Sequence, residues 1–172
     1  MSLNKGTYDY DFQAFIEEVY QFNDIADEAR GKGETTLEDL KNQYKVIHEE
    51  VLELGDALIH NNPVKVLDGV VDTLVTVLGM ARQLEDLGFD VLGACQQVAF
   101  DNLMKYPLTE SVAIDTQKFY LDKGINTTYQ ESITELGKRY VILDINKKVR
   151  KPYNFVGTDL TDYVPENFKV FA

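Results

Sequence analysis

Five carboxylates on two consecutive predicted helices are the residues of this chain best suited to chemistry. Glu49, Glu50 and Glu53 come first, and Asp68 and Asp72 follow on the next helix. Because residues three and four apart share a helix face, Glu50 with Glu53 and Asp68 with Asp72 each point two carboxylates in one direction. If the helices pack antiparallel, four carboxylates converge. Oxygen ligands of this kind suit Mg²⁺, with Mn²⁺ as a substitute, and magnesium usually accompanies a phosphorylated substrate.

The phase of the first helix predicts how close each glutamate lies to the core. At about 100° per residue, the apolar positions form one band, with Glu50 at its border, Glu53 further out and Glu49 near the opposite side. A solvated acidic helix face is the alternative for these three glutamates, since acidic runs on helices are common. The apolar positions are Ile47, Val51, Leu54 and Leu58.

Asp72 stands out on the second helix. It is the only charged residue between Gly69 and Ala81, in a segment that is apolar on nearly every face. A lone buried carboxylate costs several kcal/mol unless it is paired, protonated or bound to a metal. We therefore expect a buried Asp72 that serves as a metal ligand, or else one that bonds to a neighbouring helix or a buried lysine.

Composition narrows the class of protein. The chain has 172 residues, 44% of them hydrophobic, which is enough for one domain with a core and an appendage. Its net charge of -12 argues against a nucleic-acid surface. No apolar run is long enough to cross a bilayer, and Met1 to Tyr10 contain no apolar leader segment, so we expect no membrane partner. The single cysteine, Cys95, indicates a reducing, cytoplasmic setting.

The elements that would position the carboxylates are four helices. We expect one over 12–29, one from the capping residue Thr36 to Asn61, one from Pro63 to about Leu87, and one that begins after Asp90 and runs through Lys105. The short turn at Asn61 to Pro63 implies antiparallel neighbours. The fold class is therefore all-α in the main, an antiparallel helical bundle over 1–124.

A C-terminal β-ribbon over 125–172 is expected as an arm of the same domain. Tyr140–Ile145 is rich in β-prone residues, and 146–155 is its expected hairpin partner. Six of the 17 basic residues lie between Lys138 and Lys151, which complements a polyphosphate. The alternative is that these basic residues protect an edge strand against aggregation.

The acidic clusters resemble the motifs of a known superfamily. Glu49-Glu50-Val51-Leu52-Glu53 matches the EExxE motif of the all-α nucleoside triphosphate pyrophosphohydrolases, which include MazG-like proteins, dimeric dUTPases and phosphoribosyl-ATP pyrophosphohydrolase. Asp72 matches the aspartate of the superfamily's ExxD motif. The glutamate position of ExxD is Gly69 here, with Asp68 one place earlier, and a MazG-like branch with DxxxD spacing is more similar. Asp101-Asn102-Leu103-Met104-Lys105 resembles the third-helix signature, and the tail is similar to that of the same branch.

The resemblance implies a Mg²⁺-dependent hydrolase that splits a nucleoside triphosphate between its α and β phosphates. It implies that Glu50, Glu53 and Asp72 bind the metal with Asp68 as a fourth ligand, and that Glu49 orients or deprotonates the attacking water. It also implies a homodimer or homotetramer. Gln21 and Asn23 are expected to bind the base. The residues expected to bind the phosphates are Asn102, Lys105, Lys148, Arg150 and Lys151. Lys105 is also assigned to catalysis.

Three alternatives stay open at this stage. The substrate could be phosphoribosyl-ATP, although the C-terminal ribbon argues against that compact relative. A preference for dUTP or dCTP fits the residues equally well. The chain could also be a catalytically inactive helical module for metal binding or protein interaction, which Gly69 at a usual ligand position favours.

Overall fold

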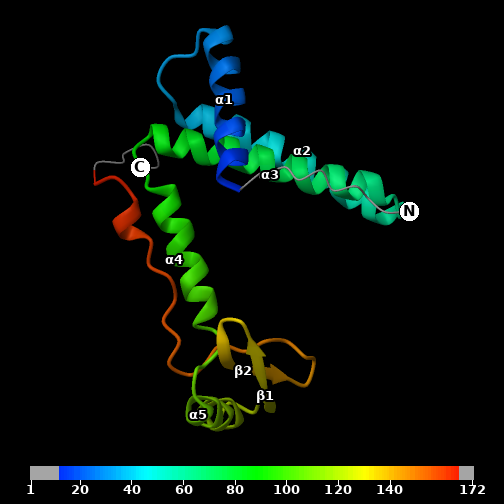
Figure 1. The fold of residues 1–172 in the computed structure, drawn as a ribbon, viewed down its shortest axis with the longest axis vertical. Coiled ribbons are helices and arrows are strands. Elements are labelled where there is room, and N and C mark those ends of the chain that lie inside the picture. The colour runs from blue at the N-terminus through cyan, green and yellow to red at the C-terminus, as the bar shows by residue number, and fades with distance from the viewer. Residues whose placement is uncertain (1–11, 167–172) are drawn as a thin grey trace. The chain divides into compact units, whose positions relative to one another are not determined.

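Five α-helices and one two-stranded antiparallel sheet make up residues 12–166, the part of the chain that the computed structural model describes (Figure 1). The mainly helical fold class with a short β-ribbon is confirmed. The chain divides into two compact units, residues 12–91 with 164–166 and residues 92–163. The elements are α1 (Phe12–Arg30), α2 (Leu37–Ile59), α3 (Pro63–Asp86), α4 (Val91–Leu103), α5 (Glu110–Leu121), β1 (Thr127–Thr134) and β2 (Gly137–Asp144), followed by a 3₁₀ turn over Thr161–Tyr163.

Local capping residues define the ends of α2 and α3. Thr36 and Asp39 form the predicted capping box, in which the Asp39 amide donates to Thr36 Oγ1 and the Thr36 amide donates to the Asp39 carboxylate. Asn62 accepts from the Lys65 amide at 3.1 Å, and Pro63 occupies the first turn of α3. Asn61 adopts a left-handed φ of 50°, which asparagine tolerates better than most residues. The connection is therefore short, and α2 and α3 pack as the expected antiparallel pair.

Two glycines allow the helices of the first unit to approach closely. Gly69 on α3 is buried, and a Cβ atom there would lie 3.0 Å from both Cα and Cβ of Leu54 on α2. Gly79 faces side chains of both other helices, since a Cβ atom would lie 3.0 Å from Gln43 Nε2 and 3.3 Å from Asn23 Oδ1. A larger residue at position 69 would press against the Leu54 backbone, whereas at position 79 it would displace only the ends of two flexible side chains.

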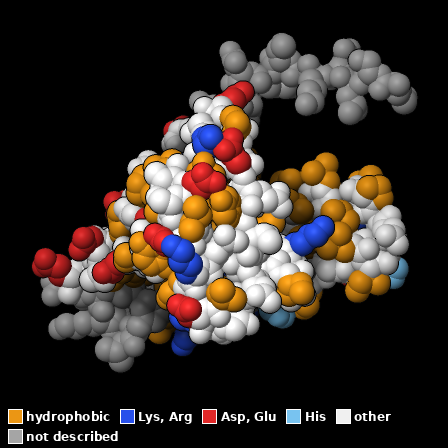
Figure 2. All heavy atoms as spheres, turned by 90° about the horizontal axis from the view of Figure 1, so that it is seen from below, with side chains coloured by type: hydrophobic (Ala, Val, Ile, Leu, Met, Phe, Trp, Pro, Cys, Tyr) orange, Lys and Arg blue, Asp and Glu red, His pale blue; other side chains and the backbone are white. Residues whose placement is uncertain are grey.

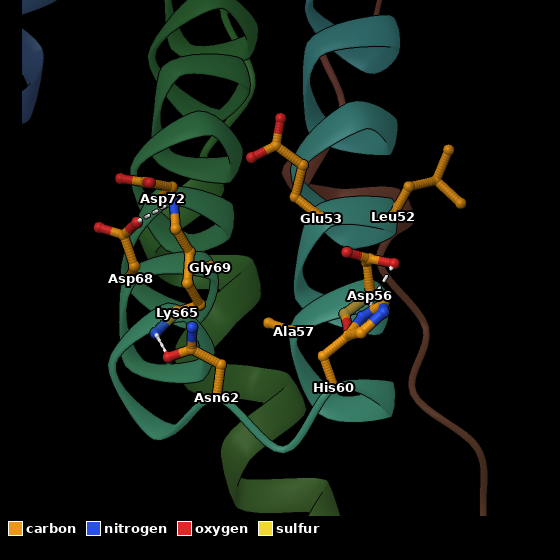
Figure 3. A pocket seen from close by; sticks show the side chains of 10 residues that line it. All are labelled: Leu52, Glu53, Asp56, Ala57, His60, Asn62, Lys65, Asp68, Gly69 and Asp72. Atoms are coloured by element: carbon orange, nitrogen blue, oxygen red, sulfur yellow. Dashed lines mark hydrogen bonds and ion pairs between the residues drawn. The ribbon is translucent and has the colours of Figure 1, made fainter.

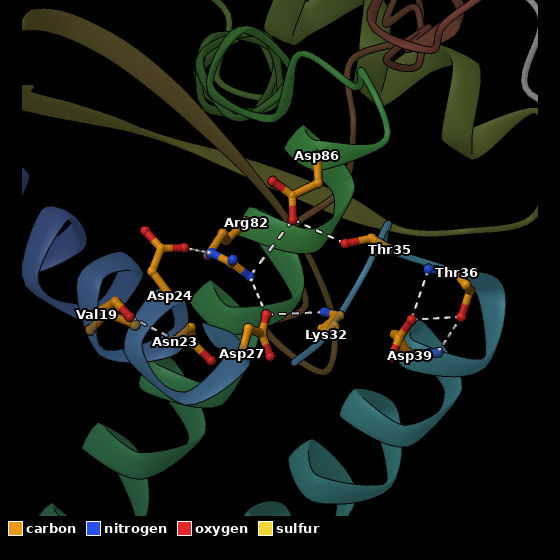
Figure 4. A network of polar contacts seen from close by, with 10 residues as sticks. All are labelled: Val19, Asn23, Asp24, Asp27, Lys32, Thr35, Thr36, Asp39, Arg82 and Asp86. Atoms are coloured by element: carbon orange, nitrogen blue, oxygen red, sulfur yellow. Dashed lines mark hydrogen bonds and ion pairs between the residues drawn. The ribbon is translucent and has the colours of Figure 1, made fainter. Parts of the chain in front are cut away.

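A charged network fixes α1 against α3 (Figure 4). The Arg82 side chain is only 13% exposed and binds Asp24 at 2.5 Å and Asp27 at 3.0 Å, both on α1. Asp27 also pairs with Lys32 at 3.1 Å in the loop that follows α1. Asp86 accepts from the Thr35 hydroxyl at 3.0 Å, which ties the same loop to the end of α3. Removing Arg82 would break both ion pairs between α1 and α3 and leave the largely buried Asp27 with Lys32 alone, so this guanidinium contributes to how α1 docks.

The second unit has a small core between α5 and the β-hairpin. Ala113, Tyr140 and Ile142 are buried together, and Tyr129 packs against them from β1. At the end of β2, the Asp144 side chain is buried and accepts from the backbone amides of Asn146 and Lys148. The Arg150 guanidinium completes the shell of Asp144 with Nη2 at 2.7 Å and Nε at 3.0 Å. Asp144 thus closes the loop that follows the hairpin.

The strand partner predicted for Tyr140–Ile145 is wrong. β2 pairs with the preceding segment, β1, in the register Thr127 to Asp144 and Thr134 to Gly137. The turn is possible because Gly137 adopts a φ of 94°, which few other residues adopt. The segment 146–155 contributes only an isolated bridge between Val149 and Leu143, because its chain folds back around Asp144. Helix α5 was not predicted either.

No helix among residues 12–166 combines the length and apolar character needed to cross a membrane.

The shell around Asp144 predicts acid sensitivity of the second unit. Backbone amides and Arg150 lower the pKa of Asp144 below its ordinary value. The ionised carboxylate therefore stabilises the fold at any pH above the ordinary pKa. This contribution is lost as the pH falls through the lower pKa of the folded state. We expect D144N to lower the melting temperature at pH 7 and to flatten its decline between about pH 5 and 2. Thermal unfolding followed by tyrosine circular dichroism measures both effects.

The matched control is D122N, an exposed aspartate of the same unit, which should behave as the wild type does. Equal pH dependence of D144N and the wild type would contradict the role of Asp144.

Candidate metal centre

Glu50 is the carboxylate in closest electrostatic contact with the others. It is half-buried on α2, as its phase predicted, while Glu49 and Glu53 are exposed. Burial raises the pKa of Glu50 most, and the negative charges of Asp72, Glu53, Glu49 and Asp68 raise it further, in that order. The largest of these charge effects comes from Asp72 on the other helix. The antiparallel hairpin therefore brings the two acidic clusters within range of each other.

Three of the predicted ligands line one cavity (Figure 3). The cavity measures about 610 Å³ and lies between α2 and α3 near their connecting turn. Asp68 and Asp72 lie on one face of α3, and Glu53 reaches from α2 toward that helix. The i, i+4 pair thus shares a face as its spacing predicted, and carboxylates from both helices border the same space.

The expectation of a buried Asp72 is wrong. Its side chain is exposed, because α3 is not enclosed within the chain on all sides. Its apolar neighbours are exposed too: Leu67 is 67% exposed, Val70 50% and Val71 42%. Hydrophobic side chains at the surface are visible in Figure 2. The apolar segment around Asp72 therefore forms a surface of the hairpin.

The carboxylates are near one another without forming a finished coordination shell. Within residues 12–166, no three His, Cys, Asp or Glu side chains are grouped closely enough to hold a metal ion. The donor set itself fits a divalent cation, because like charges that raise the pKa of Glu50 are relieved when a cation binds between them. Binding would require rotations of these side chains, most of which are exposed.

The close approach at Gly69 limits which residues α3 can carry at this position. A side chain at this position would press against the backbone of Leu54, so a glutamate ligand there would require α2 and α3 to move apart. Asp68, the neighbouring acid, is exposed, with Lys65 Nζ 3.7 Å from its carboxylate. On α3, the carboxylate therefore lies next to the contact between Gly69 and Leu54, at position 68.

Three further polar residues line the cavity that the sequence analysis did not single out. His60 Nδ1 lies 3.3 Å from an Asp56 carboxylate oxygen on α2, and Lys65 lies opposite on α3. Their spacing could have revealed them, since Asp56 follows Glu53 by three residues and Lys65 precedes Asp68 by three. Lys65 is the one lysine or arginine among the described residues that line this cavity.

All of the predicted phosphate ligands belong to the second unit. Asn102 lies at the end of α4, and Lys105 follows in the turn, since α4 ends at Leu103, two residues before the predicted end. Lys105 Nζ lies 2.5 Å from Asn102 Oδ1, so these two predicted ligands contact each other.

The three basic residues after the β-hairpin differ in their availability. Arg150 is bound to Asp144 and thereby has a structural role. Lys151 Nζ lies 4.8 Å from the centre of the Phe155 ring. Lys148 is exposed, and only its backbone amide bonds to Asp144. Lys148 is thus the least constrained of the three.

The predicted base-reading residues on α1 lie apart from the cavity. Gln21 is exposed, and Asn23 donates through Nδ2 to the Val19 carbonyl at 2.8 Å and contacts α3 at Gly79. Neither residue lines the cavity that contains Asp72. Asn23 therefore supports the packing of α1.

Comparisons with protein-family models, curated proteins and solved structures find no match to this chain.

Two glycines of the hairpin provide a matched test of the close approach. We expect G69A to destabilise the fold by about 1–3 kcal/mol, because the methyl group meets the Leu54 backbone. G55A on α2 has nothing within 4 Å of the added atom and should stabilise the helix by up to about 1 kcal/mol. Urea unfolding followed by far-UV circular dichroism measures both changes. Equal effects of the two substitutions would remove Gly69 as the point of contact.

A second test concerns the repulsion around Glu50. Because the folded-state pKa of Glu50 is raised, its ionised form destabilises the fold, and stability should increase as pH falls toward that pKa. In EDTA at pH 8, we therefore expect E50Q to melt above the wild type. Added Mg²⁺ should raise the melting temperature of the wild type and have little effect on E50Q.

The control for that measurement is E85Q, an exposed acid on α3 outside the cavity. A lower melting temperature for E50Q in EDTA, together with a full Mg²⁺ response, would remove Glu50 from the ligand set.

Proposed function

We propose that this protein is a Mg²⁺-dependent nucleoside triphosphate pyrophosphohydrolase, which releases a nucleoside monophosphate and pyrophosphate. The observation that carries the proposal is the electrostatic effect of Asp72 on α3 upon Glu50 on α2. Asp72, Glu53 and Asp68 line one cavity between these helices. Repulsion between the two acidic helix faces opposes this convergence, whereas a divalent cation bound between them would offset it. The matches to EExxE and to the aspartate of ExxD support the same reaction.

The carboxylates would divide the work of the site. Glu50, Glu53 and Asp72 would hold the metal, and Asp68 would be a fourth ligand from the exposed face of α3. When bound, Mg²⁺ supplies neutralisation of phosphate charge and a bound water of lowered pKa. Glu49, exposed beside Glu50, would orient that water or accept its proton.

Cations of the chain would bind the phosphates. Lys65 lines the cavity itself and would exchange its contact with Asp68 for a phosphate oxygen. The phosphate-binding roles expected for Asn102, Lys105, Lys148 and Lys151, which belong to the second unit, rest on the sequence resemblance alone. Arg150 would act indirectly, since its bond to Asp144 holds the loop that carries Lys148.

A homodimer or homotetramer is part of the proposal. The hairpin exposes large apolar side chains near its tip, where Ile59 is 77% exposed and Val64 is 76% exposed. Leu58 and Leu67 are also exposed. Apolar surface of this kind is stabilised when it is buried, and a symmetric contact between two hairpins would bury it in both copies at once.

A catalytically inactive metal-binding or interaction module is the second candidate. It is favoured by the absence of any preformed group of three metal-ligating side chains in residues 12–166 and by Gly69 at a usual ligand position. Phosphoribosyl-ATP is the alternative substrate. These possibilities predict different results in one assay.

The assay is pyrophosphate release from a panel of ribonucleoside, deoxynucleoside and modified triphosphates, with Mg²⁺, Mn²⁺ or EDTA. We expect release from one or a few substrates with either metal and none in EDTA. D72A should reduce kcat at least about 100-fold, because a ligand to the metal is lost. E85A on the same helix should keep wild-type activity.

Silence across the triphosphates would contradict the proposal in its main form. Activity on phosphoribosyl-ATP alone would then identify the alternative substrate, and no activity on any of them would leave the inactive module. Full activity of D72A would remove Asp72 from the ligand set.

A further inference from the structure

A second pocket lies in the first unit, away from the carboxylates. It measures about 380 Å³, within the range of small-molecule sites, and lies where α1 ends, α2 begins and α3 approaches its end. Polar side chains dominate its lining. They include two cations, two carboxylates that already have partners, and three amides: Arg30, Lys32, Asp27, Asp39, Asn42, Gln43 and Gln83.

Gln83 is the residue that distinguishes this pocket from a solvated crevice. Gln83 is only 8% exposed. Its amide oxygen is buried and has no hydrogen-bond partner among residues 12–166. Buried polar atoms nearly always have a partner, so an orphaned one requires an explanation. Gln83 lines the pocket, so a ligand that donates a hydrogen bond to its amide oxygen would supply the missing partner once the side chain turns this sealed atom toward the cavity.

The neighbouring amides leave further groups of defined type. Gln43 Nε2 donates to the Thr76 carbonyl at 2.8 Å, so its amide oxygen stays available as an acceptor. Asn42 Oδ1 accepts from Lys45 at 2.9 Å, so its amide nitrogen stays available as a donor. Acceptors and a donor around one pocket match the mixed hydrogen-bonding edge of a nucleobase.

The pocket also offers a cation for an anionic group. Arg30 is exposed at the end of α1 and makes no hydrogen bond or ion pair within residues 12–166. Lys32 is engaged by Asp27, which in turn is held by Arg82. Arg30 is therefore the free guanidinium of this pocket, and guanidinium groups bind phosphate through paired hydrogen bonds.

We propose that this pocket binds a nucleoside monophosphate, with the base edge at Gln83 and the phosphate at Arg30. Along α3, Gln83 lies eleven residues beyond Asp72, or about 16 Å at the helical rise, so this site is separate from the carboxylate cavity. The inference does not require catalysis. If the proposed function holds, the ligand is of the same chemical class as the product, and the pocket would sense it.

Isothermal titration calorimetry in EDTA tests the proposal without turnover. The probes are AMP, GMP, CMP, UMP and dTMP, each with its free nucleoside. We expect saturable binding of at least one monophosphate, weakened about tenfold or more by Q83L. R30Q should weaken the monophosphate and leave the affinity of its nucleoside unchanged.

Two controls match these variants. Q13L removes an exposed amide of α1 outside the pocket, and K41Q removes an exposed cation of α2 outside it. Both should bind as the wild type does. Because R30Q changes only an exposed side chain, it tests the proposal even if Q83L does not fold.

Three results would overturn the proposal: no saturable binding of any probe, equal affinity of the wild type and both pocket variants, or loss of binding in D72N. The last result would place the nucleotide at the carboxylate hairpin. Pyrophosphate release with no binding in EDTA would refute this pocket while leaving the proposed function intact.

Discussion

The close contact between α2 and α3 at Gly69 and Leu54 is the constraint on which the rest of the first unit depends. Leu54 backbone and side-chain atoms occupy the space that any side chain at position 69 would need. The connection from His60 to Asn62, with its left-handed Asn61, leaves the helices no alternative to an antiparallel pairing. Because the helices are this close, Glu50 experiences the charge of Asp72, and the acids on each side become one electrostatic unit.

The charges at the two ends of the α2–α3 pair are balanced differently. At the α1 end, Arg82 neutralises Asp24 and Asp27, and that pairing positions α1. At the hairpin end, the acidic residues outnumber the cations, and the pKa of Glu50 is raised first by burial and then by repulsion from the neighbouring carboxylates. A folded protein keeps unrelieved repulsion of this kind most readily where a ligand relieves it, so the acidic end is the candidate site and the paired end is its support.

Local sequence signals predicted the first unit well. The capping box at Thr36, the Asn62 cap and Pro63 act within one helical turn, so their positions in the sequence are enough. The predictions failed where residues distant in the sequence determine strand pairing or burial. The strand that pairs with Tyr140–Ile145 is decided by the turn before Gly137 and by Asp144. Asp144 accepts from the amide of Lys148 and so bends the chain after β2. The exposure of Asp72 depends on what covers α3, which its apolar neighbours alone do not reveal.

The central claim is that carboxylates of both helices bind one divalent cation together. Equilibrium dialysis against Mn²⁺, with the free ion counted by electron paramagnetic resonance, measures this directly. The account predicts at least one bound ion per chain in the wild type, much weaker binding when either Glu50 or Asp72 alone becomes its amide, and little further loss in the double variant. Binding that is unchanged in E50Q/D72N, or lost only when residues of a single helix are replaced, would contradict it.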